Sequence, residues 1–357
     1  MKFFFRENGL ALRIVEKIKA LDQPAKIMHV CGTHEQTITK HGLRSLLPEN
    51  IEVVTGPGCP VCITPAKEID EAVYLAQNYI VAIYGDMLRV PGTSISLARK
   101  KAAGGDVRVV YSPVEAVDIA IKNPDREVIF FSIGFETTAP MTAQILLNSP
   151  PENFSILCSH RLIPPALDFL LKEGIGIDGL IDPGHVSTMI GVSPYEPLSR
   201  KYHMPQVIAG FEPLDVLMAI YMLMKQIRNN EAKVENEYTR SVTYEGNTIA
   251  QGMLNKVFKA DSREWRGLAV IPQASLSLRK EFEKFDAKKK FDIPSPAGET
   301  CNQDCCFCAN VIKGTGRPKD CPNFGTNCTP ESPIGACMVS TEGTCSIVYR
   351  YGNIVNQ

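Results

Sequence analysis

Cysteine is the residue type in this sequence of 357 residues whose number and spacing point most clearly to chemistry, since twelve are present. They are unevenly distributed: three lie within the first 62 residues, and eight fall between Cys301 and Cys345. The remaining one, Cys158, lies alone in an apolar run and is expected to pack as a small hydrophobe. The N-terminus, MKFFFRENG, lacks the features of an export signal, so we expect a cytoplasmic location. In reducing cytosol, clustered cysteines indicate metal ligation or redox chemistry.

The cysteine-rich tail, residues 301–352, has few large apolar residues and cannot build a core of its own. A metal centre would organise such a segment. The tail contains no histidine, and four of its cysteines are separated by loops rich in glycine and proline, which suits a [4Fe–4S] cluster. A structural zinc site and free redox thiols remain alternatives. The four cysteines are Cys308, Cys321, Cys328 and Cys345.

A second pattern in the tail, CxxxCxxC, is formed by Cys301, Cys305 and Cys308. This spacing is typical of radical S-adenosylmethionine enzymes, in which a large barrel follows the motif. Too few residues follow Cys308 for such a barrel, so we do not adopt this interpretation.

Near the N-terminus, Cys59 and Cys62 form a CxxC motif that follows a glycine-rich turn. In this spacing one thiol stabilises the thiolate of the other, which permits a reversible disulfide or a metal-binding pair. A buried pair in a plain turn is the alternative, because Pro60 and the glycines also suit a turn.

Cys31 ends an apolar run and opens the motif CGTHE. A helix is expected to begin here, and its amide groups would lower the pKa of the Cys31 thiol. His34 is a candidate for proton transfer, with Glu35 orienting it. The alternative for His34 is a hydrogen bond to backbone at the helix start. His29, inside the apolar run, is expected to be a core residue with its hydrogen bonds satisfied.

From about residue 24 to 215, short apolar runs rich in β-branched residues alternate with helical patterns. Runs that are apolar throughout are typical of strands buried on both faces, so the pattern predicts an α/β fold with parallel sheets. The predicted strands are 26–31, 52–55, 79–84, 107–111, 128–133, 154–158, 179–181 and 206–208.

Most of these runs end in a short polar turn that contains glycine. Because the carboxyl ends of parallel strands form the ligand crevice, residues of these turns are candidates for proton transfer or for ligand positioning. They are Glu136 in GFETT, Glu212 in GFEP and, more weakly, His185 in DPGH. Helix capping and turn hydrogen bonds are the alternative roles for the two glutamates.

The strand pattern predicts two similar parallel-sheet α/β lobes that face each other across a cleft. The first is expected over 24–124, with CGTHE and GPGCPVC, and the second over 125–220, with GFETT, DPGH and GFEP. The cysteine-rich iron–sulfur domain is expected over 240–357, together with 1–23. A net charge of −1 with no basic run argues against nucleic acid as a partner, and no apolar stretch is long enough to cross a membrane.

The motifs CGTHE, GPGCPVC, GFETTAP, GFEP and CTPESPIGACMVSTEGTC occur in this order. On this series the chain resembles the HypD family of [NiFe] hydrogenase maturation factors over nearly its full length. The resemblance implies two α/β domains and a [4Fe–4S] domain. It also implies a scaffold that, with a small HypC-type partner, assembles an iron unit carrying two cyanides and one carbonyl. Cyanide would come from a HypE-type donor, and the unit would pass to a hydrogenase large-subunit precursor.

By the same resemblance, Cys31 is the thiol that binds the iron, and Cys59 and Cys62 are the redox pair. The implied cluster ligands are Cys308, Cys321, Cys328 and Cys345. The tail cysteines whose role stays open are Cys301, Cys305, Cys306 and Cys337.

We therefore expect a scaffold with redox activity rather than a conventional enzyme, in which the cluster provides electrons to the CxxC pair for ligand transfer. One alternative is an iron–sulfur-dependent thiol–disulfide oxidoreductase, for which the CxxC motif and the cluster would suffice. Another is a structural zinc protein with a binding role. The additional group of Cys31 and His34 favours the assembly function.

Overall fold

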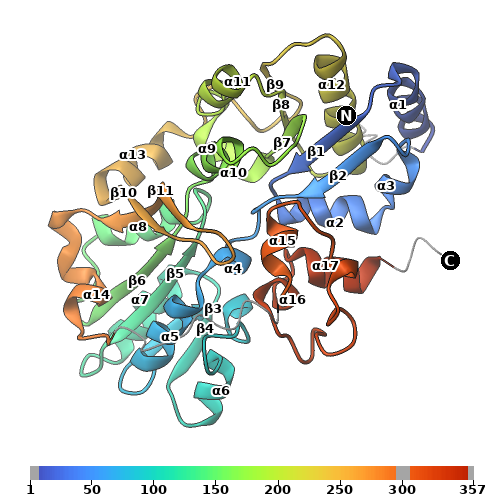
Figure 1. Ribbon diagram of the computed structural model, residues 1–357. Helices are drawn as coiled ribbons and strands as arrows, with labels where there is room; N and C mark the ends of the chain where they lie inside the picture. Colours follow the sequence, from blue (N-terminus) through green and yellow to red (C-terminus); the bar gives the residue numbers. More distant parts are fainter. Residues whose placement is uncertain (1–7, 295–305, 353–357) are drawn as a thin grey trace.

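Two separate parallel sheets are formed by the buried β-branched segments in the computed structural model, which describes residues 8–294 and 306–352 (Figure 1). The five-stranded sheet has the order β2-β1-β7-β8-β9, and we call this sheet and its helices the first lobe. Its strands are β1 (Ala25–His29), β2 (Ile51–Thr55), β7 (Gly179–Pro183), β8 (Gln206–Ala209) and β9 (Val234–Asn236). All four pairings are parallel, as expected for strands covered on both faces.

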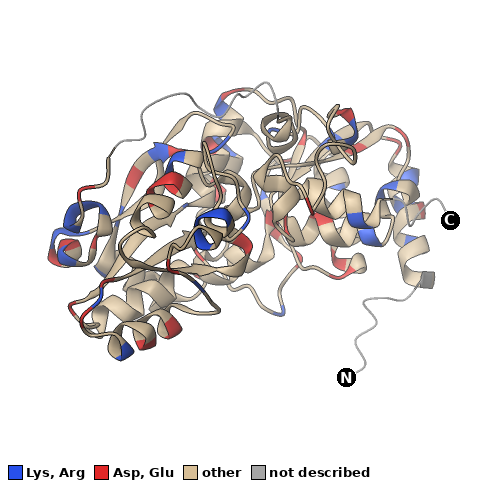
Figure 2. Ribbon diagram, turned by 90° about the horizontal axis from the view of Figure 1, so that it is seen from below, with Lys and Arg blue, Asp and Glu red and all other residues tan. Residues whose placement is uncertain are grey.

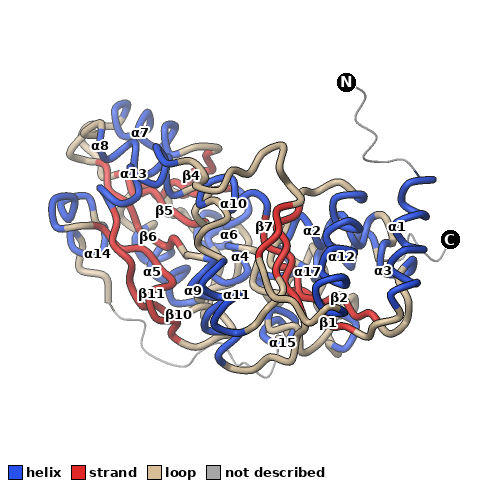
Figure 3. Tube along the Cα trace, turned by 90° about the horizontal axis from the view of Figure 1, so that it is seen from above, coloured by secondary structure: helices blue, strands red, loops and turns tan. Residues whose placement is uncertain are grey.

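The four-stranded sheet, also parallel throughout, has the order β4-β3-β5-β6 and defines the second lobe. Its strands are β3 (Ile80–Tyr84), β4 (Val107–Val110), β5 (Val128–Gly134) and β6 (Phe154–His160). An antiparallel hairpin of β10 (Phe258–Glu264) and β11 (Val270–Leu278) packs against β6, as the view from above shows (Figure 3). The α/β class with two parallel sheets is thus confirmed.

The chain passes between the lobes three times, which the expected split near residue 125 did not foresee. It leaves the first lobe after β2, forms all four strands of the second lobe, and returns with β7. After β9 it crosses once more to the second lobe, where the hairpin of β10 and β11 packs on β6. The expected division of the strands is therefore wrong: β3 pairs with β5 across residue 125, and β1 pairs with β7. An apolar run shows that a strand is buried but carries no information about which strand lies beside it.

Helices cover both faces of the two sheets. Helix α1 packs against α12 in the first lobe rather than against the tail, contrary to the expected grouping of residues 1–23. The helices up to the return of the chain are α1 (Asn8–Leu21), α2 (Gly32–Lys40), α3 (Leu43–Leu46), α4 (Pro60–Ile63), α5 (Ala66–Leu75), η1 (Gly85–Met87), α6 (Leu97–Ala102), α7 (Pro113–Lys122), α8 (Ala139–Leu147) and α9 (Ile163–Lys172). Those that follow are α10 (Gly184–Ile190), α11 (Glu196–Tyr202), α12 (Pro213–Arg228), α13 (Thr248–Val257), η2 (Lys280–Phe285) and α14 (Ala287–Lys290).

Several helices begin where the sequence provides a cap. Ser112 precedes α7 and its hydroxyl accepts from the amide of Glu115, with Pro113 in the first turn. Asn247 caps α13 in the same way. These local signals fix where the helices start, while burial of their apolar faces against the sheets provides most of their stability.

The tail lies between the lobes as a group of short helices and loops (Figure 1). Its helices are α15 (Cys308–Ile312), η4 (Pro318–Asp320), α16 (Ala336–Val339) and α17 (Thr344–Tyr351). Helix α17 packs on α2, and α16 packs on α4. The hairpin of β10 and β11, which falls within the expected iron–sulfur domain 240–357, belongs instead to the second lobe.

Charged residues of both signs alternate over the two lobes, and neither sign dominates the face shown in Figure 2. This agrees with the net charge of −1. Among the described residues, no helix combines the length and apolar character needed to span a membrane.

A buried ion pair joins α5 to β6 inside the second lobe. The guanidinium of Arg161, which is 1% exposed, donates to Glu68 at 2.9 Å and to the carbonyl of Glu264 at 3.1 Å. Ser159 donates to the same carboxylate. Burial raises the pKa of Glu68, whereas the positive charge of Arg161 and the hydrogen bonds lower it. The second effect is larger, so the pKa of Glu68 lies below its usual value.

We expect Glu68→Ala to lower the free energy of unfolding by about 3–5 kcal/mol, because it leaves a buried guanidinium without its counter-charge. Urea unfolding followed by circular dichroism would measure the change. Lys201→Ala, which removes an exposed pair with Asp168, is the control and should leave the midpoint unchanged. Equal behaviour of the two variants would contradict the prediction.

Candidate thiol and metal site

Cys31 lies at the carboxyl end of β1 and is the N-cap of α2, with an extended backbone. The turn around it is tightly packed. A side chain at Gly58 would come within 2.2 Å of the Cys31 amide nitrogen, and one at Gly32 within 2.4 Å of the carbonyl oxygen of Glu342. Both glycines therefore permit a close approach of backbone that a larger residue would prevent. As a result Cys31 is buried, with 8% of its surface exposed.

The electrostatic environment of Cys31 is the reverse of the expected one. Burial raises the pKa of the thiol to about 11, and the nearby Glu342 carboxyl group acts in the same direction. The amides of Thr33 and His34 at the start of α2 lower it, but they do not compensate. The expectation of a lowered pKa is therefore wrong, since desolvation outweighs the helix N-terminus. Cys31 is a neutral thiol at neutral pH.

His34 is fully buried, and its Nε2 lies 3.2 Å from the carbonyl oxygen of Ala209 and 3.0 Å from that of Gly210. Two carbonyl acceptors place the proton on Nε2, which leaves a lone pair on Nδ1. The Nδ1 atom has no hydrogen-bond partner. Burial lowers the pKa of His34 to about 3, so the ring is neutral at neutral pH.

Glu35 does not orient His34 as expected. Its carboxylate accepts from Arg44 at 2.6 Å and contacts His29 Nε2 at 2.8 Å. The positive charge of Arg44 and these hydrogen bonds lower the pKa of Glu35 against the effect of burial. His29 lies in the core as expected and contacts the Thr55 hydroxyl at 3.1 Å. Its Nδ1 has no hydrogen-bond partner, so the expectation that all its hydrogen bonds are satisfied is wrong.

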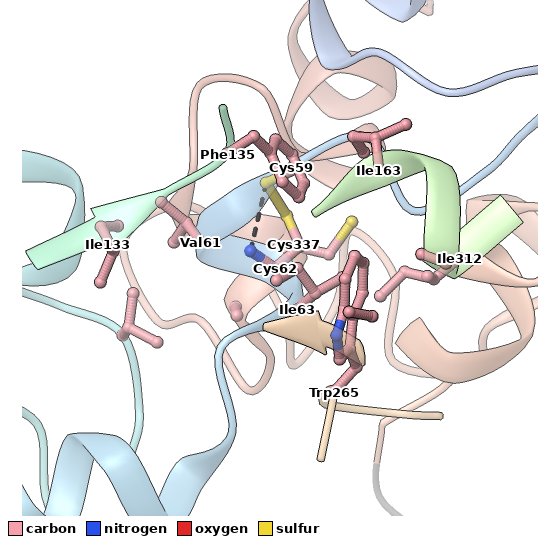
Figure 4. Close-up of a cluster of buried hydrophobic side chains, with 14 of the residues drawn as sticks. Cys59, Val61, Cys62, Ile63, Ile133, Phe135, Ile163, Trp265, Ile312 and Cys337 are labelled. Carbon is pink, nitrogen blue, oxygen red and sulfur yellow. Dashed lines mark hydrogen bonds between the residues drawn. A yellow bond between two sulfur atoms is a disulfide. The ribbon is translucent and has the colours of Figure 1, made fainter. Parts of the chain in front are cut away.

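Cys59 and Cys62 form a disulfide across the single turn of α4, on the segment that leads from the first lobe to the second (Figure 4). The hairpin tip covers this pair from the second lobe. Trp265, which is fully buried, lies near Cys62 and Cys337 in Figure 4. Arg266 fixes the tip, because its backbone amide donates to the Ile63 carbonyl at 2.8 Å and its Nε to the Thr64 carbonyl at 2.6 Å.

The sulfur atoms of Cys308, Cys337 and Cys345 lie within 4.8 Å of one another in the tail. Cys306 extends this group, since its sulfur is 3.0 Å from that of Cys308. Cys328 is near enough for the charges of Cys306 and Cys308 to affect its pKa, which burial raises. The structure thus brings Cys308 and Cys345 of the expected ligand set together with Cys337, whose role the sequence left open. Cys321 is half-buried, and Cys301 and Cys305 lie outside the described residues.

This group of thiols is chemically suited to a soft metal or to an iron–sulfur cluster. Three cysteine sulfurs converge without a carboxylate or imidazole in the described group, and thiolates select zinc, copper(I) or iron–sulfur over hard cations. The neighbouring sulfurs of Cys306 and Cys308 provide further donors. The residues therefore fit the cofactor that the sequence predicts, although they do not distinguish a cluster from zinc.

All three cysteine groups meet at one small cavity of about 10 Å³, which has room for a single molecule of the size of water. Cys31 comes from the first lobe, Cys59 and Cys62 from α4, and Cys337 from the tail. Glu342 also lines this cavity, which we call the thiol cavity.

Sequence reasoning missed two buried carboxyl groups, of which Glu342 lines the thiol cavity. Glu342 lies in the tail motif between two of its cysteines, and burial raises its pKa. Asp182, in the DPGH turn, is completely buried, and neither of its carboxyl oxygens has a hydrogen-bond partner. Burial raises the pKa of Asp182 well above its usual value, which keeps it protonated. For Asp182 the available signal was a charged residue at the end of a buried strand.

The candidates at the other strand ends have different surroundings. Glu136 accepts from the amide of Ile163 at 2.9 Å, and burial raises its pKa to about 7. Glu212 is the N-cap of α12 and forms a capping box, which is the structural role foreseen as an alternative. His185 stacks on Phe211, with the ring centroids 3.9 Å apart.

Comparison with known proteins supports the resemblance. The family model described as HypD, hydrogenase formation hypA family, matches residues 9–352. The chain belongs to the HypD family. A putative hydrogenase expression/formation protein of Methanocaldococcus jannaschii is 51% identical over 98% of this chain and 99% of its own length. The hydrogenase maturation factors HypD of Cupriavidus necator and Azotobacter vinelandii are 45% and 42% identical, each over 98% of this chain and 96% of its own length.

Glu136→Gln should change the pH dependence of stability. With a folded pKa of about 7 against an ordinary value of 4.5, the folded chain holds a proton at Glu136 that the unfolded chain has released. This group therefore stabilises the fold fully below pH 4.5, and the contribution is lost as the pH rises through 7. Relative to wild type, the variant should gain about 3 kcal/mol between these limits, since a tenfold change in proton affinity corresponds to about 1.4 kcal/mol. Urea unfolding at several pH values measures this difference, and parallel curves would contradict it.

Proposed function

We propose that this member of the HypD family holds the iron of an Fe(CN)2CO unit at Cys31 while the unit is assembled, with a HypC-type protein as partner. The observation that supports this most directly is the convergence of Cys31, the Cys59–Cys62 pair and Cys337 on the thiol cavity. An iron-binding thiol, a two-electron redox pair and a sulfur of the metal-binding tail then share one site. The chain acts as a scaffold with redox activity rather than as a conventional enzyme.

Cys31 suits the binding of a ferrous ion that carries cyanide and carbonyl, because a thiolate is a soft ligand. The free thiol is neutral, so binding of the iron must release its proton, and the positive charge of the ion stabilises the thiolate. His34 is a candidate for passing this proton on rather than for holding it, since its Nδ1 lone pair has no partner, it follows Cys31 by one helical turn, and burial lowers its pKa to about 3. A thiolate from the partner would complete the protein ligands.

The tail is proposed to hold a [4Fe–4S] cluster with the ligands Cys308, Cys321, Cys328 and Cys345. When bound, such a cluster supplies single electrons for reduction of the Cys59–Cys62 disulfide. That reduction breaks the S–S bond, takes up two electrons and two protons, and gives two thiols. Cys337 is placed between the two sites, since it lies within 4.8 Å of Cys308 and also lines the thiol cavity.

The other partners follow from the same proposal. A HypE-type protein would donate cyanide, and the finished unit would pass to a hydrogenase large-subunit precursor. A cytoplasmic location is part of the proposal, because reversible dithiol chemistry and an iron–sulfur cluster suit a reducing compartment.

Protein purified without oxygen should contain about four iron and four acid-labile sulfide per chain, with a broad visible charge-transfer band. We expect Cys308→Ala or Cys321→Ala to lose both the sulfide and the band. Cys158→Ala is the matched control, because this buried thiol donates to the Leu276 carbonyl in the second lobe and should leave the content unchanged. Zinc without sulfide would contradict the cluster and leave a structural tail.

Cys59→Ala and Cys62→Ala should each prevent assembly of the iron–cyanide unit, because neither variant can form or break the disulfide. The measurement is the infrared absorption of the cyanide and carbonyl ligands on protein isolated with its HypC-type partner. Cys158→Ala should again behave as wild type. Normal ligand bands in the two variants would refute the redox role of the pair.

An iron–sulfur-dependent thiol–disulfide oxidoreductase is the second candidate, and the disulfide across α4 next to the tail thiols favours it. The two functions differ in their need for Cys31. Catalytic reduction of a protein disulfide by a Cys31→Ala variant, without iron beyond the cluster, would support the oxidoreductase.

A further inference from the structure

A second cavity, of about 540 Å³, lies between the first lobe and the tail and has no part in the function proposed so far. One wall is formed by α2, α3 and β2, and the other by α15, η4 and α17. We call it the reservoir. Its apolar lining residues are Ile38, Leu47, Ile51, Val53, Val54, Val311 and Val348.

The charged side chains of the reservoir largely neutralise one another. Arg44 pairs with Glu35 at 2.6 Å, and Arg317 pairs with Glu52 at 2.8 Å. The other charged lining residues are Glu49 and Lys319, again of opposite sign. With an apolar lining and no excess of either charge, the reservoir suits uncharged molecules better than ions.

Two threonines separate the reservoir from the thiol cavity. Thr55 and Thr344 line both, and their hydroxyl oxygens are 3.1 Å apart. Thr55 is held within the first lobe, since its hydroxyl also donates to Glu35 at 3.3 Å. Thr344 is the first residue of α17 in the tail. Rotation of the Thr344 side chain would therefore break the one hydroxyl–hydroxyl bond that joins the two residues at this boundary.

The volumes of the two cavities limit the size of the molecules that can move from the reservoir to the thiol cavity. The reservoir holds several small molecules, whereas the thiol cavity has room for only one of about the size of water. We infer that the reservoir stores uncharged ligands of one or two heavy atoms, the class of carbon monoxide, and that Thr55 and Thr344 form the gate through which they reach Cys31. This rests on the proposed function, in which such ligands fill open positions of an iron at Cys31.

Xenon tests the reservoir, because it occupies apolar protein cavities. Crystals of the full-length protein under xenon pressure should show xenon between Val311 and Val348. Val348→Phe, which fills the space, should abolish it. An empty reservoir in pressurised wild-type crystals would overturn the inference.

Hydrogen peroxide tests the gate, because it is uncharged and has two heavy atoms. The sulfur of Cys31 attacks one peroxide oxygen, the O–O bond breaks, and the leaving hydroxide takes up the thiol proton, which gives a sulfenic acid at Cys31 and water. After the remaining peroxide is removed, the protein is unfolded in the presence of a carbon nucleophile that traps the sulfenic acid, and the adduct is quantified at each cysteine by mass spectrometry. Val348→Phe should slow the reaction at Cys31 several-fold, and Thr344→Ser, which removes a methyl group, should accelerate it.

Two controls separate the gate from general effects. Thr341 contacts Asp86 and does not line the reservoir, so Thr341→Ser should not change the rate of oxidation at Cys31. Oxidation of Cys158 in the same sample is the internal reference. An unchanged rate at Cys31 in Val348→Phe would show entry from elsewhere and refute the gate. Because both measurements use protein without iron at Cys31, failure of the proposed assembly function would leave them unaffected.

Discussion

The close packing of the tail on the turn after β1 is the constraint on which the rest of the site depends. The backbone of Glu342 occupies the space that a side chain at Gly32 would need, and Cys31 is similarly confined by Gly58. This packing closes the thiol cavity and places Cys337 in its wall. It also places Thr344 against Thr55. Loss of this contact would separate the tail, with Cys337, from Cys31.

Burial of this kind determines the charge state of the groups around Cys31. The pKa of the Cys31 thiol and of Asp182 is raised, and that of His34 is lowered, in each case mainly because burial disfavours the charged form. The site is therefore a set of neutral groups in a medium of low dielectric constant. Such a site favours a bound cation once a thiolate forms, since the attraction between the two charges is weakly screened.

The sequence predicted the strands better than their arrangement. All eight apolar runs coincide with strands, with ends that differ by at most two residues. They could be recognised because strands buried on both faces consist almost entirely of apolar residues. Which strands share a sheet is decided by long-range packing, so the repeated passage of the chain between the lobes was not predicted. The hairpin was missed because β10 is largely exposed and lacks a continuous apolar pattern. The sequence motifs indicated which cysteines form the site. They did not indicate that the pKa of Cys31 is raised rather than lowered, because this depends on how deeply the tail buries the thiol.

The arrangement also explains why redox and assembly chemistry would occupy one site. Reduction of the Cys59–Cys62 pair adds two thiols to the wall of a cavity that has room for about one water-sized molecule. Any thiolate formed there would lie beside Cys31 with little water to screen it, so its charge would act directly on an iron held by that residue. An oxidised pair has no such charge. If reduction leaves one of the two sulfurs as a thiolate, the state of the disulfide would alter the electrostatic environment of Cys31, and the proposed redox and assembly functions would be coupled through charge.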